Sequence, residues 1–172
     1  MGCSIGGSCA LEVALAAPEQ VAGIVLVGAK AGVNPDPTLR AEAIQVLETQ
    51  GMAAAWRKYW LPLFSASTSS SIKDSARSWA MEQDVSSVVN GVRAFHDQRD
   101  LSAFAAGWDR SLLGISGDRD VAPSPSQLRQ IATGPKRAFH LVPECGHYVN
   151  LEQPVAFDEL VADAIRTIVE RS

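Results

Sequence analysis

The sequence predicts an α/β fold in which a mostly parallel sheet carries flanking helices and an inserted helical layer. Two observations lead to this prediction. Apolar runs without the alternation of a half-exposed strand occur in the first and last thirds of the chain, with helical segments between them. Aromatic and aliphatic residues then recur at helical spacing over the long middle stretch. A length of 172 residues is sufficient for one sizeable core.

The elements of the first part follow one another closely. Residues 6–17 are rich in Ala and Leu and predict a helix, which Pro18 ends because proline cannot continue the backbone hydrogen bonds. Residues 21–27 are apolar without alternation, as in a parallel strand covered on both faces. Residues 28–32, with a glycine at each end, terminate that strand.

The middle of the chain predicts a helical cap. We expect residues 34–107 to form this cap, and residues 1–33 together with residues 108–172 to form the core domain around the sheet. A serine-rich run at residues 65–71 predicts a flexible surface loop. The apolar positions that indicate the cap helices are Leu39, Ile44, Val46, Leu47, Trp56, Tyr59, Trp60, Trp79, Val88, Val89 and Phe95.

The alternation of strand and helix resumes after Trp108. Residues 111–116 and 137–142 predict strands, with a short helix over residues 125–133 between them. The last segment, residues 154–169, predicts an amphipathic helix packed on the sheet. Its apolar positions at helical spacing are Phe157, Leu160, Val161, Ala164, Ile165 and Ile168.

Composition and charge disfavour several classes of function. The chain is 47% apolar and 20% charged with a formal net charge of −4, so nothing favours nucleic acid as a partner. No signal-like segment and no bilayer-length apolar run is visible, so we expect a cytoplasmic protein without membrane contact. Cys3, Cys9 and Cys145 are odd in number and lack C-x-x-C spacing, which predicts reduced, mostly buried thiols. His96 and His140 lack partners at metal-ligand spacing, so we expect no metal and no cofactor.

The motif with most chemical content is Gly2-Cys3-Ser4-Ile5-Gly6, which matches G-x-S-x-G. Such a motif places a serine on a sharp turn between a strand and a helix, which exposes its hydroxyl as a candidate nucleophile. The backbone N–H of Ile5, at the start of the helix, would supply one half of an oxyanion hole. We expect Gly2 and Gly6 to be glycines because the strand and helix approach closely there. A phosphate-binding loop is disfavoured because no lysine follows the motif.

Two further candidates complete a pattern. Asp120 ends Gly117-Asp118-Arg119-Asp120 after one predicted strand, and His147 lies in Cys145-Gly146-His147 after the next. Strands of an open parallel sheet gather reactive groups at their carboxyl ends. Asp118 competes with Asp120 as the acid, either aspartate could simply cap a turn, and His147 could be a buried structural histidine. In the catalytic interpretation, His147 removes the proton of Ser4, and Asp120 orients the imidazole.

Together these segments resemble the α/β-hydrolase superfamily, in particular its esterases, lactonases and carbon–carbon hydrolases with a helical cap. The resemblance rests on the elbow at residues 2–7, on the Gly117 to Asp120 turn before Pro123, and on residues 146–154 followed by Phe157. It implies that Ser4, Asp120 and His147 form a triad. It also implies a longer protein, in which strands before the elbow and a loop, often His-Gly, supply the second oxyanion donor.

The resemblance implies hydrolysis of a small-molecule carboxylic ester or lactone through an acyl-enzyme on Ser4. Serine rather than aspartate at this position argues against haloalkane dehalogenase and epoxide hydrolase chemistry. The aromatics Trp56, Tyr59, Trp60, Phe64 and Trp79 are expected mainly in the cap core, with some lining the pocket and favouring an apolar acyl group.

The alternative is a truncated, weakly active or non-catalytic protein that acts as an oligomerising or binding module. The strand at residues 21–27 would then have an open apolar edge. A homo-oligomer, or a second polypeptide that carries the missing amino-terminal half, would cover that edge.

Overall fold

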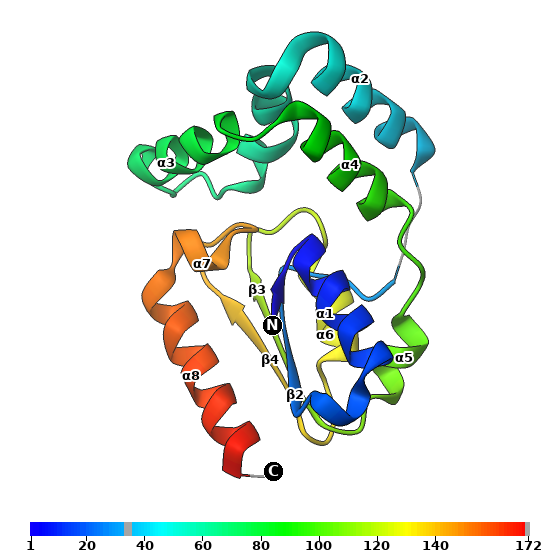
Figure 1. Cartoon of the computed structure of the whole chain (residues 1–172). Coiled ribbons are helices and arrows are strands. Elements are labelled where there is room, and N and C mark those ends of the chain that lie inside the picture. The colour runs from blue at the N-terminus through cyan, green and yellow to red at the C-terminus, as the bar shows by residue number, and fades with distance from the viewer. Residues whose placement is uncertain (33–35, 171–172) are drawn as a thin grey trace.

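A computed structural model describes residues 1–32 and 36–170 of the chain. Its centre is a parallel four-stranded sheet with the strand order β1-β2-β3-β4, and a layer of helices lies above the carboxyl ends of the strands (Figure 1). The predicted α/β fold with a parallel sheet is therefore confirmed. The strands are β1 (Gly2–Cys3), β2 (Gly23–Val27), β3 (Ser111–Gly117) and β4 (Arg137–Val142).

The three helices that were predicted with bounds agree with α1, α6 and α8 to within about two residues at each end, and α7 was not predicted. The first begins at Ile5 and ends at Ala16, and the strand predicted from residue 21 begins at Gly23 because Pro18–Gln20 forms a 3₁₀ turn before it. The helices are α1 (Ile5–Ala16), α2 (Pro37–Ala55), α3 (Ser70–Met81), α4 (Val85–His96), α5 (Ser102–Gly107), α6 (Pro125–Ile131), α7 (Val149–Glu152) and α8 (Pro154–Glu170).

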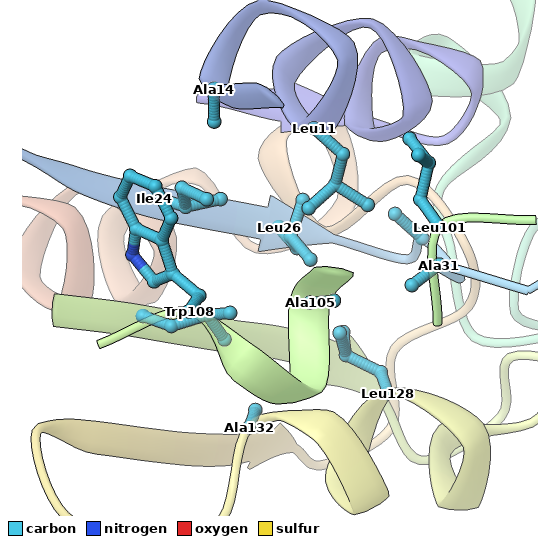
Figure 2. Close-up of a cluster of buried hydrophobic side chains, with 12 residues drawn as sticks. Leu11, Ala14, Ile24, Leu26, Ala31, Leu101, Ala105, Trp108, Leu128 and Ala132 are labelled. Carbon is cyan, nitrogen blue, oxygen red and sulfur yellow. The ribbon is translucent and has the colours of Figure 1, made fainter. Parts of the chain in front are cut away.

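Both faces of the sheet are covered, as the unbroken apolar runs predict. Alternate residues of β2 point to opposite sides: Ile24 and Leu26 belong to one buried cluster, and Val25 and Val27 to another. The first cluster joins the sheet to α1, α5 and α6 (Figure 2), and the second joins it to α8. One residue of the predicted apolar face of α8, Ile165, does not take part, since its side chain is 54% exposed.

The helical layer (α2, α3 and α4) has buried clusters of its own. Val46, Leu47 and Val89 join α2 to α4, while Trp56, Phe64 and Ala76 form a second cluster nearer to α3. α5 does not belong to this layer, because Leu101 and Ala105 pack in the cluster that joins the sheet to α1 and α6. The predicted boundary at Asn34 lies outside the described residues. The division into a core domain and a cap remains a prediction.

The serine-rich run forms the predicted surface loop only in part, since residues 65–69 lie outside helices and strands but the first serine is buried and the last two begin α3. Ser65 is 5% exposed, and its backbone N–H donates to the Glu152 carboxyl group. Ser69 caps α3, whose first turn contains Ser70 and Ser71. Composition alone misleads here because serine hydroxyls satisfy helix ends and buried acceptors as readily as they face water.

Within residues 1–32 and 36–170, the structure has no helix long and apolar enough to cross a bilayer.

Candidate active site

Ser4 occupies the turn between β1 and α1 with an unusual backbone conformation. Its φ is 52° and its ψ is −123°, a combination that costs a residue with a Cβ free energy of order 1–3 kcal/mol. The Ser4 N–H donates to the Val27 carbonyl at 2.9 Å, which fixes the turn against the end of β2. Ile5 is the first residue of α1, so its N–H has no acceptor one turn earlier in the helix and is free to stabilise negative charge.

Of the two glycines that we predicted to allow close packing around Ser4, Gly2 does so and Gly6 does not. A Cβ on Gly2 would lie 1.9 Å from the Gly6 carbonyl oxygen, and one on Gly7 would lie 2.4 Å from the Ala29 Cβ. A Cβ on Gly6 would meet nothing within 4 Å. The prediction for Gly6 is therefore wrong within the described residues, and Gly7 takes that role because its side of α1 faces the segment after β2.

Asp120 and His147 form a buried pair at the ends of β3 and β4. The distance from His147 Nδ1 to Asp120 Oδ2 is 3.0 Å, and the two residues are 1% and 6% exposed. When Nδ1–H donates to this carboxyl group, Nε2 is left as the basic ring nitrogen. Asp118 is directed elsewhere, since its side chain accepts from the Cys145 N–H and lies 3.7 Å from Arg119. The geometry thus favours Asp120 over Asp118 as the orienting acid.

Sequence reasoning missed Gly28, which lies against this pair. Its φ is +52°, and an added Cβ would lie 3.1 Å from His147 Nδ1 and 3.2 Å from Asp120 Oδ2. Any side chain here would crowd both members of the pair. The sequence signal for this role is a glycine directly after an apolar strand, which by itself indicates only where the strand ends.

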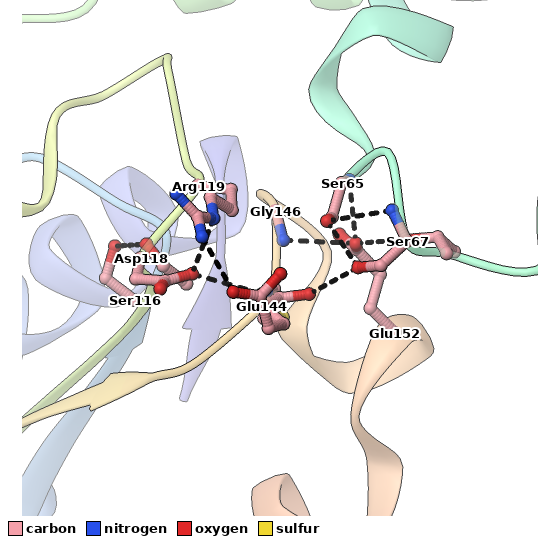
Figure 3. Close-up of polar contacts among 11 residues, drawn as sticks. Ser65, Ser67, Ser116, Asp118, Arg119, Glu144, Gly146 and Glu152 are labelled. Carbon is pink, nitrogen blue, oxygen red and sulfur yellow. Dashed lines mark hydrogen bonds and ion pairs between the residues drawn. The ribbon is translucent and has the colours of Figure 1, made fainter.

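Glu152 is a second residue whose role was missed. It is 9% exposed and accepts four hydrogen bonds, from the backbone N–H groups of Ser65, Gly146 and Tyr148 and from the Thr68 hydroxyl. Figure 3 shows this carboxyl group between the segment before α3 and the loop that carries His147. The His147 N–H also donates to the Leu63 carbonyl at 2.9 Å. The position of His147 is therefore fixed by contacts to the helical layer as well as by Asp120.

A cavity of about 310 Å³ opens beside Ser4. None of the five cap aromatics considered for the pocket lines it: Trp56 and Phe64 are buried in a cluster of the helical layer, and Trp79 is 56% exposed. Phe95 is the one Phe, Trp or Tyr among the described lining residues. The expectation that most of the five aromatics pack within the helical layer agrees with the structure, and the expectation that some of them line the pocket is wrong for this cavity. Its lining consists of Ser4, Ser8, Gly28, Ala29, Lys30, Asp36, Leu39, Phe95, His96, Gln98, Val121, Ala122, Pro123, Ser124 and Gln127.

The thiols near the site are poor candidates for chemistry. Burial, with the nearby charge of Asp120, raises the pKa of Cys3 to about 11, and burial raises the pKa of Cys145 to about 12, so both stay protonated at neutral pH. Cys9 is exposed, against the expectation of mostly buried thiols. No group of three or more His, Cys, Asp or Glu side chains among residues 1–32 and 36–170 could hold a metal ion.

Solved structures with this arrangement of elements include enzymes of different substrate classes. A thermophilic esterase from Thermogutta terrifontis with malate bound is 19% identical, with a TM-score of 0.89 over 97% of this chain and 64% of its own. An enol-lactonase from Burkholderia xenovorans LB400 is 23% identical, with a TM-score of 0.83 over 96% and 64%. The 2-hydroxy-6-oxo-6-phenylhexa-2,4-dienoate hydrolase from Rhodococcus sp. strain RHA1 is 18% identical, with a TM-score of 0.69 over 96% and 62%.

The chain thus spans a little under two thirds of the length of these three structures. No curated protein matches its sequence significantly. The sequence profile of the alpha/beta hydrolase family, in contrast, matches residues 1–160. That match includes the elbow, the Asp120 turn and the His147 loop, and the fold agrees with it throughout, so the chain belongs to the alpha/beta hydrolase family.

Proposed function

We propose that the chain carries the triad of a serine hydrolase that cleaves a carboxylic ester or a lactone, with Ser4 as nucleophile, His147 as general base and Asp120 as the orienting acid. The observation that carries the proposal is the strained Ser4 at the start of α1, combined with the buried His147–Asp120 pair at the same edge of the sheet. Membership of the hydrolase family and the esterase and lactonase neighbours support the reaction class.

In the proposed reaction, Ser4 Oγ attacks the substrate carbonyl carbon while His147 Nε2 takes the hydroxyl proton. The carbonyl oxygen becomes an oxyanion, to which the Ile5 N–H donates at the positive end of the α1 dipole. His147 then gives its proton to the leaving alcohol oxygen, and the carbon–oxygen ester bond breaks to leave an acyl group on Ser4. Water, deprotonated by His147, attacks this acyl group and releases the acid.

Labelling with a fluorophosphonate, followed by intact-mass measurement, tests the nucleophile. We expect one adduct on the wild-type chain and none on Ser4→Ala. Ser8→Ala is the matched control, because Ser8 lines the same cavity on α1 and should not affect the adduct. Equal labelling of the wild type and Ser4→Ala would contradict the proposal.

A second candidate is a module that acts through association instead of catalysis. β1 pairs with only Leu26 and Val27 of β2, and Met1 and Val13 are 68% and 58% exposed beside the unpaired part of that strand. We expect such a module to sediment as an oligomer and to show no Ser4-dependent adduct. A sedimentation mass of one chain together with Ser4 labelling would exclude it.

A further inference from the structure

The cavity beside Ser4 has a mixed lining of apolar and polar residues that includes one lysine. Lys30 is the one Lys or Arg among its described lining residues, and it forms no salt bridge with a carboxylate of residues 1–32 or 36–170. Its ammonium group lies 5.6 Å from the centre of the Phe95 ring, a contact that attracts the cation without neutralising it. A half-buried lysine with an uncompensated charge in an open cavity is a site for an anion.

The one carboxylate that lines the cavity is already engaged. Asp36 Oδ1 accepts the Leu39 N–H at 2.8 Å and caps the start of α2, where the helix dipole stabilises its negative charge, and Asp36 forms no salt bridge with Lys30. Arg40, which lies on α2 outside the lining, pairs with Asp97. The charge of Lys30 is therefore available to a ligand.

The other polar groups of the wall are neutral hydrogen-bonding groups. Burial lowers the pKa of His96, and the positive charge of Arg40 lowers it further. Of the lesser effects on this pKa, Asp36 and Asp97 raise it and Lys30 lowers it. A neutral imidazole offers one N–H donor. Gln98 and Gln127 offer amide donors in the same cavity. One cation and three neutral donors in the same cavity are groups that can bind a carboxylate.

The segment that carries Lys30 is tied to the proposed catalytic groups. Gly28 lies against His147 and Asp120, and Ala29 packs against Gly7 beside the elbow. Lys30 follows them directly, so its Cα lies within about 7 Å of the Gly28 Cα. A substrate held by Lys30 would thus have its position set relative to Ser4 by one short, packed segment.

We propose that Lys30 binds a carboxylate on the acyl part of the substrate, so that the preferred substrates are esters or lactones of acids that carry a second, anionic carboxyl group. This inference rests on the proposed function for the reaction at Ser4, but the anion site itself does not require turnover. It replaces the apolar acyl group expected from the sequence with a charged one.

The test compares two esters of similar shape. 4-Nitrophenyl hemisuccinate carries a carboxylate where 4-nitrophenyl 4-methylpentanoate carries an isopropyl group. We expect the wild-type chain to prefer the hemisuccinate in kcat/KM, and Lys30→Gln to lower that preference by about five-fold, the upper range for a solvent-accessible ion pair. Lys30→Arg should retain most of the preference. Lys73→Gln, a lysine of α3 outside the cavity lining, is the control and should leave it unchanged.

Binding and labelling separate the two proposals. We expect calorimetry to show succinate binding to the wild type, about five-fold weaker in Lys30→Gln and weaker at high salt. Fluorophosphonate labelling of Ser4 should be the same in both. If Ser4 is labelled but Lys30→Gln changes neither the ester preference nor the succinate affinity, the anion site is overturned and the proposed nucleophile is retained. Absence of labelling would overturn the nucleophile, and succinate affinity would then decide the anion site alone.

Discussion

The two sides of the candidate site are built in opposite ways. Around His147 and Asp120, side chains are buried and held by hydrogen bonds that extend into the helical layer. Around Ser4, the backbone is strained, the residue is half-buried and a cavity opens. The difference teaches that the two sides would divide the work of the proposed mechanism: the buried side would fix the base, and the open side would present the nucleophile and a helix end to a substrate.

The comparison predicts its largest effect at Asp120. Asp120→Asn removes the acceptor that holds the Nδ1–H tautomer of His147, so we expect Ser4 to react with a fluorophosphonate about 10⁴-fold more slowly. Asp118→Asn, two residues away and directed toward the Cys145 N–H, is the control and should label at close to the wild-type rate. Similar losses in both variants would mean that the pair does not set the reactivity of Ser4.

A smaller effect is expected at Glu152. Glu152→Gln keeps the size of the side chain but replaces one acceptor oxygen with an NH₂ group among backbone donors, so we expect a loss of about 1–3 kcal/mol in unfolding free energy. Urea denaturation followed by circular dichroism measures this loss.

Glu144→Gln is the control for Glu152, because Glu144 contacts Arg119 on an exposed surface and its replacement should leave the urea midpoint unchanged. If the two glutamate variants lose equal stability, the four hydrogen bonds at Glu152 do not hold the His147 loop as described.

The smallest effect concerns the three thiols, whose reactivity reports how accessible each side of the candidate site is to solvent. We expect brief treatment with iodoacetamide at pH 8 to add one group, on the exposed Cys9 of α1. Cys145 in the His147 loop and Cys3 in the elbow should stay unmodified, because their raised pKa values, about 12 and about 11, keep them as thiols. Intact mass of the wild type and Cys9→Ser checks this, and rapid modification of Cys145 would show that its side of the site opens.

Local patterns were sufficient to predict most of the fold and to propose the triad. Residues 111–116 could be predicted as a strand because burial on both faces leaves an apolar run in the sequence. Residues 137–142 were predicted as a strand from the alternation of strand and helix signals, and most of this strand is exposed or half-buried. Ser4, Asp120 and His147 could be proposed because each stands in a short motif next to such a strand. The geometry of the Asp120–His147 pair then supported the choice over Asp118.

The parts that could not be predicted depend on contacts between distant segments. Gly7 and not Gly6 meets the segment after β2, which only the direction of α1 decides. Phe95 lines the cavity and none of the five aromatics considered for the pocket does, because helical spacing alone does not show which side chains face Ser4. The role of Glu152 could not be predicted, because its hydrogen-bond donor Ser65 lies far away in the sequence and a lone glutamate is usually a surface charge.

The contacts of Glu152 have a consequence for chain entropy. The helical layer is part of a long connection between β2 and β3. Glu152 binds the segment from Ser65 to Thr68, near the middle of this connection, through hydrogen bonds. The entropic cost of closing a loop grows with its length, so a connection that is held at its middle behaves as two shorter loops. The carboxyl group of Glu152 thereby couples the folding of the helical layer to the folding of the sheet.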